Sequence, residues 1–357
     1  MSAFPEKDTV AMHFVRAALL RLEPGAWPRL LAQAGIAEEL LRAPQGRVTA
    51  DAFAALWLAV ARELDDEFFG LDRRRMKVGT FGLIVRASLH ARDLGHALQR
   101  LLHGLAVVFD DVALGLQVRQ RQAVVRIDNR ITEPEARRFA DETLLVIVHG
   151  VLCWLAGRRV PLQAVAFAHP APEHADEYRA MFCRQLLFDA PITAMVFDAR
   201  MLKAAIRQTE ATMRAFLQVA PRSVFLKYRN PDGWSARLRR RLRAGLEQGA
   251  LPSFKAIVRE WHVAPTTMRR RLEAEGTTFQ TIKDELRRDS AIHQLTAGGR
   301  SVNAIAVDLG FREPSAFRRA FRRWTGVQPL AYRGTVSDPA TPLRRRPATG
   351  HQEQPTP

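Results

Sequence analysis

The chain has 357 residues, a formal net charge of +17 and two cysteines. This length is enough for two or three domains, and so few cysteines exclude a fold held together by disulfides. The N-terminus has no charged head followed by an apolar core, and the longest apolar run, residues 144–156, is too short to span a bilayer. The sequence therefore predicts a cytoplasmic protein with no membrane partner.

The N-terminal segments predict a layer of helices. Apolar residues recur at helical spacing in five segments: residues 10–22, 27–41 and 50–64, and two more between 79 and 109. Pro24-Gly25 separates the first two segments, and Asp93 separates the last two. Thr49 precedes the third segment, so its hydroxyl is the expected N-cap of that helix.

Alternation typical of strands begins at residue 113. It occurs in four segments, residues 113–120, 123–129, 162–169 and 195–198. Helical segments lie between and after them, at residues 133–157, 173–182 and 199–219. The sequence therefore predicts an α+β N-terminal domain in which helices cover a mostly antiparallel sheet.

Residues 301–333 have the pattern of a helix, a tight turn and a second helix. Ile305 and Leu309 belong to one apolar stripe, and Gly310 then supplies the left-handed backbone that a tight turn needs. Pro314 suits the first turn of the second helix, because its missing N–H would be unpaired there. A helix-turn-helix unit followed by a short tail is therefore expected.

The second helix of this unit has one apolar and one basic face. Phe317 and Phe321, four residues apart, face the interior, whereas Ser315 and Arg319 point nearly opposite at about 100° per residue. Such a helix suits the major groove of DNA. A single amphipathic helix with arginines on its solvated face is the simpler alternative.

The same pattern occurs upstream, in residues 254–276. Six positions match, 48 residues apart before the second helix and 49 apart within it: Ile257 with Ile305, Trp261 with Leu309, Val263 with Phe311, Pro265 with Pro314, Met268 with Phe317 and Leu272 with Phe321. His262 takes the place of Gly310, and histidine is enriched at positive φ. Ala264 is a poor N-cap for the helix that follows. This repetition favours two DNA-binding units over an accidental amphipathic helix.

The positive charge is concentrated in the same region. Residues 235–333 carry 20 Lys and Arg against 9 Asp and Glu, a net charge of +11 out of +17. A basic domain of this kind indicates a polyanionic partner. A membrane surface would need an unburied aromatic face, whereas the aromatic residues here fall at core positions. The run Arg239-Arg240-Arg241 is expected to form a solvated face that attracts phosphates.

The segment AIAVDLGFREPSAFRRAFRRWTGVQPLAYR, residues 304–333, resembles the C-terminal pattern of AraC/XylS-type transcription regulators, and the likeness extends from about residue 234. The resemblance implies two recognition helices, joined by a connecting helix at residues 279–295, in successive major grooves of double-stranded promoter DNA. It also implies RNA polymerase as a partner. Carried over by position, it gives six DNA-binding residues: Thr266, Arg269, Arg270, Ser315, Arg318 and Arg319.

Residues 10–220 resemble the arabinose-binding-type ligand-binding domain found in a subset of AraC-type regulators. The likeness rests on FGLIVRASLHARDLGHALQRLLHGLAVVF and AFAHPAPEHADEYRAMF. It implies a homodimer and an unidentified small-molecule effector; the apolar helices favour a mostly apolar compound, and an amino-acid-like one stays open. Where the family commonly has Phe-Gly-Cys-Pro-Val, this chain has Phe182-Cys183-Arg184-Gln185-Leu186. If that loop borders the effector pocket, Arg184 changes the ligand preference.

These patterns divide the chain into four parts. They are an effector-binding and dimerisation domain (1–227), a linker (228–234), a DNA-binding domain with two helix-turn-helix units (235–333) and a disordered tail (334–357). Asn-Pro and Asp-Gly in the linker are turn signals. Ser235 is the expected N-cap of the first helix that follows.

The sequence has no G-x-S-x-G, Walker, H-E-x-x-H or paired C-x-x-C motif, so no enzyme and no cofactor is predicted. His90, His96 and His103 share a helical region but lack a third type of ligand, so no metal site is expected. The alternative function is an enzyme, such as a DNA alkyl-acceptor, fused to the DNA-binding module. It would need an activated cysteine, whereas Cys153 lies in the apolar stretch VLCWLA.

Overall fold

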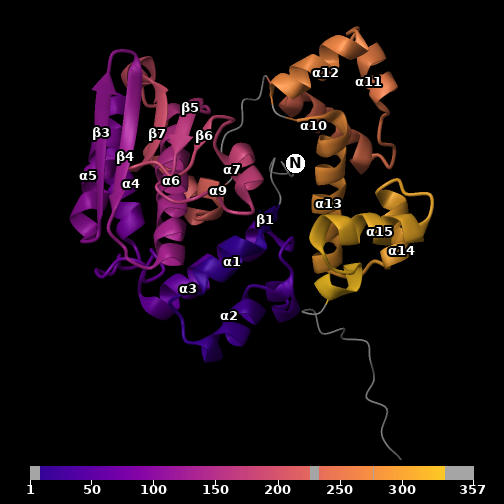
Figure 1. Cartoon of the computed structure of the whole chain (residues 1–357), viewed down its shortest axis with the longest axis horizontal. Coiled ribbons are helices and arrows are strands. Elements are labelled where there is room, and N and C mark those ends of the chain that lie inside the picture. The colour runs from indigo at the N-terminus through magenta and orange to yellow at the C-terminus, as the bar shows by residue number, and fades with distance from the viewer. Residues whose placement is uncertain (1–8, 226–232, 276, 334–357) are drawn as a thin grey trace, which may run out of the picture.

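A computed structural model describes residues 9–225, 233–275 and 277–333. Figure 1 shows a sheet with helices on one face, a layer of short helices beside it, and a helical C-terminal part next to both. The sheet and the short helices make up the N-terminal domain, residues 9–225. The C-terminal domain begins at residue 233. The predicted tail, and all of the predicted linker except its last two residues, lie outside the described residues.

One layer of the N-terminal domain is a five-stranded sheet in the order β3-β4-β7-β5-β6. Its strands are β3 (Val112–Arg119), β4 (Gln122–Asn129), β5 (Leu162–Ala166), β6 (Leu186–Leu187) and β7 (Thr193–Asp198). Neighbouring strands are antiparallel except β5 and β6, which are parallel. The predicted, mostly antiparallel sheet is confirmed. Strand β6 was not predicted, because two residues are too few to show alternation.

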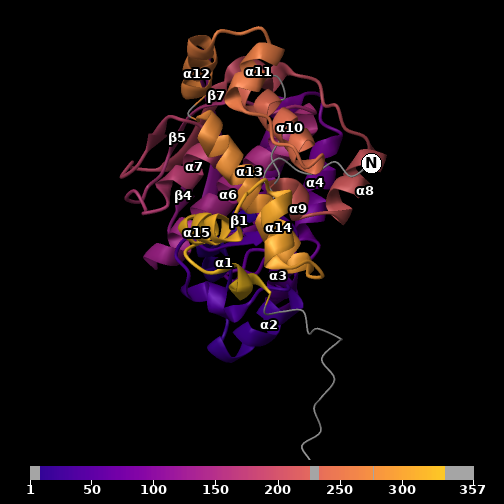
Figure 2. The same ribbon diagram turned by 90° about the vertical axis from the view of Figure 1, so that its right-hand side faces the viewer.

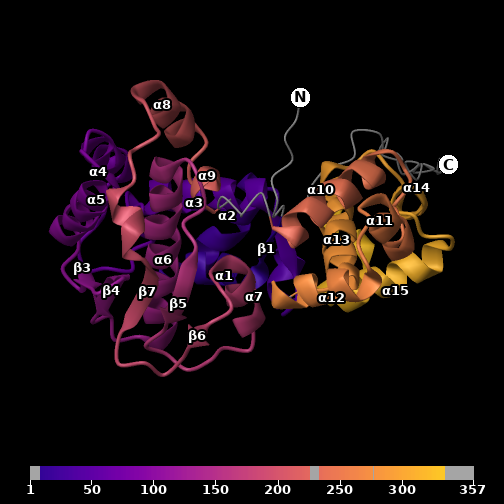
Figure 3. The same cartoon turned by 90° about the horizontal axis from the view of Figure 1, so that it is seen from above.

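Three helices cover one face of this sheet (Figures 1 and 3): α4 (Thr80–Leu89), α5 (Leu94–Val108) and α6 (Pro134–Ala156). The Asp93 side chain accepts the His96 N–H and caps α5, so the predicted break at this residue is confirmed. Helix α6 has the length and apolar character of a membrane span, but its most apolar window is entirely buried inside the domain. It is therefore the central core helix.

Residues 9–64 form the second layer, with α1 (Met12–Ala18), α2 (Trp27–Gln33) and α3 (Ala50–Leu64). The Thr49 hydroxyl caps α3 by accepting the Ala52 N–H at 3.1 Å, as predicted. The helix predicted at residues 10–22 is partly wrong, because its start belongs to a small antiparallel sheet of β1 (Thr9–Ala11) and β2 (Arg47–Thr49). Strands of three residues leave no periodic signal in a sequence.

Short helices close the N-terminal domain: α7 (Ala175–Met181), α8 (Glu210–Gln218) and α9 (Arg222–Phe225). The helical region predicted at 199–219 is interrupted, because a 3₁₀ turn (Ala199–Lys203) and an extended stretch precede α8. Helix α9 packs tightly on α6. A Cβ on Gly150 of α6 would lie 2.7 Å from the Val224 carbonyl oxygen, so only glycine permits this approach.

The C-terminal domain is entirely helical, as predicted. Its helices are α10 (Trp234–Glu247), α11 (Phe254–Glu260), α12 (Pro265–Ala274), α13 (Phe279–Ala297), α14 (Val302–Asp308) and α15 (Pro314–Thr325), followed by a 3₁₀ turn (Pro329–Tyr332). The prediction that Ser235 caps the first helix is wrong, because Ser235 lies inside α10. The N–H groups of Trp234 and Ser235 instead donate to the Glu275 carboxylate, each at 2.8 Å. This carboxylate comes from the end of α12, which no local pattern predicts.

The two helix-turn-helix units differ in where they bury their apolar residues. The first unit packs on α10 and the start of α13 in a separate core that includes Leu238, Met268 and Ile282. The second unit, with Phe317 and Phe321, belongs to the same continuous core as the N-terminal domain. The second unit is therefore continuous in packing with the N-terminal domain, whereas the first is not.

A buried polar cluster crosses the boundary between the two domains. The Arg47 guanidinium donates from Nε to the Thr9 hydroxyl oxygen at 2.8 Å and from Nη1 to Glu177 of α7 at 2.5 Å. The Thr9 hydroxyl in turn donates to Asp289 of α13 at 2.8 Å, and the Arg47 N–H donates to the Tyr332 hydroxyl oxygen at 3.1 Å. We call these five residues the interdomain cluster. Arg47 is 4% and Asp289 7% exposed, so both charges depend on these partners.

Electrostatics keep Asp289 ionised in this cluster. Burial would raise the pKa of its carboxyl group, but the neighbouring Arg288 and Arg47 outweigh that effect. Its pKa therefore lies below the ordinary value. The carboxylate of α13 thus remains an acceptor for Thr9 throughout the neutral range.

Phe321→Ala is expected to lower the free energy of unfolding by about 3–5 kcal/mol, because Phe321 is fully buried and aromatic truncation leaves a cavity. Because Phe321 lies in the core that the second unit shares with the N-terminal domain, hydrogen exchange should increase in α13, α15, β1 and β2. Leu272→Ala in the first unit is the matched control. Its increase in exchange should stay within α10 to α13, and an increase that reaches β1 and β2 would contradict the separation of the two cores.

The stability of the protein should fall as the pH falls below about 6.5 because of His13. This ring stacks on His174, 3.5 Å between centroids. Burial and the nearby His174, against the opposing effect of Glu177, lower the pKa of His13 to about 2. The unfolded chain therefore takes up a proton at His13 near pH 6.5, whereas the folded chain does not. Below that pH, the free energy of unfolding decreases by up to ~1.4 kcal/mol per pH unit.

Urea denaturation between pH 7 and pH 4.5 measures this slope. His13→Gln should reduce it by about one proton, whereas His103→Gln, at an exposed position of α5, should leave it unchanged. Equal slopes in the wild type and His13→Gln would show that His13 does not titrate in this way.

Candidate nucleic-acid interface

The two helix-turn-helix units share one backbone plan. The side chains of Ser253 and Ser301 each cap the first helix by accepting a backbone N–H at 3.1 Å. In the turns, His262 and Gly310 have φ angles of 52° and 72°, so the predicted equivalence of these two positions is confirmed. Ala264 makes no side-chain cap, as expected. The sequence repeat is therefore a structural repeat.

The second helix of each unit buries one face and exposes the other. Met268 and Leu272 of α12, like Phe317 and Phe321 of α15, are at most 1% exposed. The six predicted DNA-binding residues are all exposed: Thr266, Arg269, Arg270, Ser315, Arg318 and Arg319. Their exposure is a condition for DNA contact and does not by itself demonstrate it.

Helix α13 holds the two recognition helices apart. In Figures 2 and 3, α12 and α15 lie toward the same side of α13, α12 near one end and α15 near the other. The 19 residues of α13 span about 28 Å at 1.5 Å per residue. One turn of DNA repeats every ~34 Å, so helices held this far apart suit neighbouring major grooves on one face of a duplex.

Within each unit, one of the two predicted arginines is held by its own first helix. The Arg269 guanidinium lies over the Phe254 ring, 5.0 Å from its centroid. At the equivalent position of the second unit, Arg318 donates to the Asn303 side-chain oxygen at 3.4 Å. These contacts orient both guanidinium groups along the edge of their recognition helix.

The next residue in each helix is unrestrained. Arg270 and Arg319 are equivalent by the 49-residue repeat. The side chain of neither residue has a hydrogen bond, ion pair or ring contact with another described residue. An exposed arginine without intramolecular partners keeps its five N–H donors available. The same division between a held and an unrestrained arginine thus occurs in both units.

The interpretation of the run at Arg239 as a solvated face is wrong for two of its residues. Arg239 is 9% exposed and forms an ion pair with Glu285 of α13. Arg241 pairs with Glu260 of α11 at 2.9 Å. These arginines fasten α10 to its neighbours. The carboxylates lie 46 and 19 residues away, so the local sequence shows nothing of this pairing.

Supporting residues were also missed by sequence reasoning. Arg287 of α13 donates to the Gly310 carbonyl at 3.2 Å and lies over the Phe311 ring, 4.6 Å from its centroid. Arg271 of α12 lies over the Trp234 ring, 4.4 Å from its centroid. Both support a helix-turn-helix unit from behind the exposed face. Only the tertiary fold brings these rings and guanidinium groups together.

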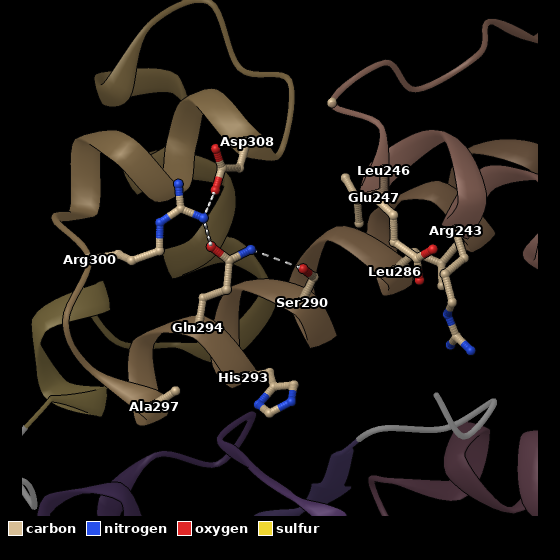
Figure 4. A pocket seen from close by; sticks show the side chains of 11 residues that line it. Arg243, Leu246, Glu247, Leu286, Ser290, His293, Gln294, Ala297, Arg300 and Asp308 are labelled. Atoms are coloured by element: carbon tan, nitrogen blue, oxygen red, sulfur yellow. Dashed lines mark hydrogen bonds and ion pairs between the residues drawn. The ribbon is translucent and has the colours of Figure 1, made fainter. Parts of the chain in front are cut away.

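Residues of α10, α13 and α14 line a cavity of about 510 Å³ (Figure 4). Figure 2 shows α10 and α14 on the opposite side of α13 from α12 and α15. Figure 4 shows Arg300 paired with Asp308, and Gln294 bonded to Ser290 at 3.2 Å. Charges of both signs line this cavity, with Glu247 and Asp308 beside Arg243 and Arg300. It is therefore not part of the basic face.

Arg184 lies in contact with the C-terminal domain. Its guanidinium donates to the carbonyl of Ala274 at the end of α12. It is not among the residues that line the largely apolar cavity of the N-terminal domain, described further below. The residue that departs from the family pattern therefore contacts the first recognition helix.

The alternative of a reactive cysteine gains no support from the surroundings of Cys153. Its side chain is fully buried, and its sulfur accepts the Val160 N–H at 3.3 Å. Within the described ranges, no group of three or more His, Cys, Asp or Glu side chains is placed to hold a metal ion.

Two helix-turn-helix units on one connecting helix, with arginines exposed on one side, define a DNA-binding protein of the helix-turn-helix class. Residues 257–335 match a family model described as a helix-turn-helix domain. Residues 25–206, about half of the chain, match the model described as the arabinose-binding domain of AraC transcription regulator, N-term. The chain belongs to the AraC family of transcription regulators, with a ligand domain followed by a DNA-binding domain.

Named relatives agree with this assignment. The chain is 29% identical over 301 residues to the ornithine utilization regulator of Pseudomonas aeruginosa, covering 84% of this chain and 88% of that protein. It is 26% identical over 288 residues to the regulator VirS of Mycobacterium tuberculosis, covering 79% and 83%. A crystal structure of the regulator CdpR from Pseudomonas aeruginosa matches 90% of this chain and 96% of that one, at 20% identity and a TM-score of 0.32. The names of the first two proteins describe regulators.

Arg319→Ala is expected to weaken binding to the preferred DNA site more than to random duplex. A bidentate arginine–guanine pair is worth about 1–3 kcal/mol of discrimination, or roughly 5–150-fold. Arg270→Ala should behave in the same way, because Arg270 is equally unrestrained. Fluorescence anisotropy with both duplexes measures this ratio.

Arg271→Ala is the matched control, since Arg271 is the next residue of α12 but faces Trp234. It should leave the ratio of specific to random binding unchanged. An equal loss on both duplexes for Arg319→Ala would assign Arg319 to phosphate contact.

Proposed function

We propose that the two units bind successive major grooves of promoter DNA through Thr266, Arg269, Arg270, Ser315, Arg318 and Arg319. The observation that carries this proposal is the repeated arginine pair on two exposed helix faces that α13 holds on one side. The unrestrained Arg270 and Arg319 read guanine edges. The held Arg269 and Arg318 contact the flanking phosphates, and Thr266 and Ser315 make smaller base or backbone contacts.

The N-terminal domain is proposed to sense a small molecule and to form a homodimer. RNA polymerase is the proposed protein partner at the promoter, and the cytoplasm is the proposed location of the protein. These assignments follow from membership in the family. Likeness to the ornithine utilization regulator makes an amino acid one candidate effector class, and a mostly apolar compound is the other. We place the effector-binding and dimerisation domain at residues 1–227 and the linker at 228–234. The DNA-binding domain is placed at 235–333 and the tail at 334–357.

The experiment is genome-wide mapping of the DNA bound by the full chain, followed by titration of the most enriched duplex. The full chain is needed because the second unit shares its core with the N-terminal domain. Enrichment of a two-part site with half-sites about one helical turn apart supports the proposal. Binding without preference among duplexes at moderate ionic strength would overturn it.

The salt dependence separates the two proposed arginine roles. Binding should weaken steeply with salt, because each phosphate contact contributes about −0.9 to the slope of log K against log salt concentration. Arg318→Ala should reduce the magnitude of this slope by about one, whereas Arg319→Ala should leave it unchanged. The reverse pattern in titrations between 50 and 200 mM salt would exchange the two roles.

A further inference from the structure

A cavity in the N-terminal domain lies against the segment that leads to the linker. Its volume is about 300 Å³, and it lies between α3, α4, α6, α8 and α9. Figure 3 shows α8 and α9 on the side of the domain where α3, α4 and α6 meet. Most of the lining side chains are apolar, and they include Trp57, Met76, Phe81, Ile147, Leu217 and Val224. Proteins of this size commonly place small-molecule ligands in such concave, mostly apolar sites.

Two of the apolar side chains that line the cavity are exposed to solvent. Leu58 is 39% and Val78 51% exposed, although burial of either would be favourable. The volume equals that of about ten water molecules at ~30 Å³ each. It therefore suits a ligand of about ten non-hydrogen atoms and is too small for a long-chain lipid.

The charged side chains that line the cavity decide the ligand class. Glu67 is already used, because its two carboxylate oxygens accept the N–H groups of Gly79 and Phe81 at 2.9 and 2.7 Å. Arg62, in the last turn of α3, is exposed and has no ion pair with any residue in the described part of the chain. The site thus offers an apolar interior and an available cation at its edge.

We propose that this cavity binds the effector, and that the effector is a small carboxylate with an alkyl or aryl body whose carboxylate pairs with Arg62. This inference rests on the proposed function of the N-terminal domain as a sensor. A diamino acid fits poorly, because its two ammonium groups would need acidic partners and the single lining carboxylate already holds the start of α4. The ligand class therefore differs from what the ornithine regulator's name suggests for that protein.

The cavity is positioned to transmit binding. Ala220, Pro221 and Val224 line it, and α9 ends at Phe225, immediately before the linker region. Arg222 of α9 pairs with Asp51 of α3 at 2.7 Å, and Gly150 allows α9 to lie directly on α6. A ligand therefore contacts the element through which the chain passes from the sensor to the DNA-binding domain. Coupling of this kind between an effector site and a DNA site typically changes the affinity for DNA by 5–150-fold.

Isothermal titration of the full chain with octanoate and phenylacetate tests the site directly. We expect saturable binding of one molecule per chain. Octylamine, with the same body but a positive charge, should bind at least about tenfold more weakly, and ornithine should not displace octanoate. Absence of saturable binding for both carboxylates, or displacement by ornithine, would overturn the proposal.

Variants locate the binding. Arg62→Gln should weaken octanoate about tenfold and leave 1-octanol unchanged. Arg86→Gln, at an exposed arginine of α4 that does not line the cavity, is the matched control and should change neither. Gly82→Leu should abolish binding of octanoate and of 1-octanol. Gly82 lines the cavity beside Leu217, so a leucine side chain at this position would fill it. Unchanged octanoate affinity in Arg62→Gln would contradict the assignment.

A second surface variant avoids any dependence on the folding of Gly82→Leu. Val78→Glu places a negative charge at the exposed rim, so it should weaken octanoate and strengthen octylamine. If both compounds change in the same direction, they do not bind with their charged groups beside Arg62, and the proposal fails.

DNA titrations distinguish a failure of this proposal from a failure of the DNA-binding proposal. Saturating octanoate should change the affinity of the full chain for its preferred duplex, and the duplex should change octanoate affinity by the same factor. Sequence-specific DNA binding without octanoate binding would overturn only the effector site. Octanoate binding without preference among duplexes would overturn only the proposed DNA contacts.

Discussion

The burial of one guanidinium group, that of Arg47, holds the two domains of this protein together. A charge out of water costs several kcal/mol unless partners compensate it, and the partners of Arg47 come from four elements of both domains. Glu177 neutralises it, Thr9 links it to Asp289 of α13, and its N–H reaches Tyr332 after α15. Because each partner depends on the others, this polar cluster acts cooperatively, and it fixes the relative position of the domains together with their shared apolar core.

The two DNA-binding units contact the N-terminal domain unequally. The second unit shares an apolar core with the N-terminal domain, whereas the first has its own core and is touched through Arg184 at the end of α12. If the proposed effector changes the N-terminal domain, these contacts would alter the orientation of one unit relative to the other about α13. The spacing of the two recognition helices, and hence their fit to neighbouring grooves, is the quantity that such a change would affect.

The interdomain cluster and the proposed effector cavity are formed by different elements of the N-terminal domain. The interdomain cluster lies at β1, β2 and α7, and the proposed effector cavity lies at α3, α4 and α9. Helix α6 connects them, since Ile147 lines the cavity while Glu142, five residues earlier, accepts a hydrogen bond from the hydroxyl of Tyr178 in α7. One largely buried helix thus joins the proposed effector cavity to the element that holds Arg47.

The sequence by itself determined the features that repeat or that act over a few residues. The 48- and 49-residue spacings, the positive φ at His262 and Gly310, the Thr49 cap and the exposed arginines of α12 and α15 all follow from local periodicity and turn chemistry. Only the tertiary structure decided which charges are paired and where. Arg239, Arg241 and Glu275 find partners 19 to 46 residues away, and the three-residue strands β1 and β2 pair across 38 residues. The physical reason is that pairing of buried charges and of short strands depends on distances in space, and neither leaves a period in the chain.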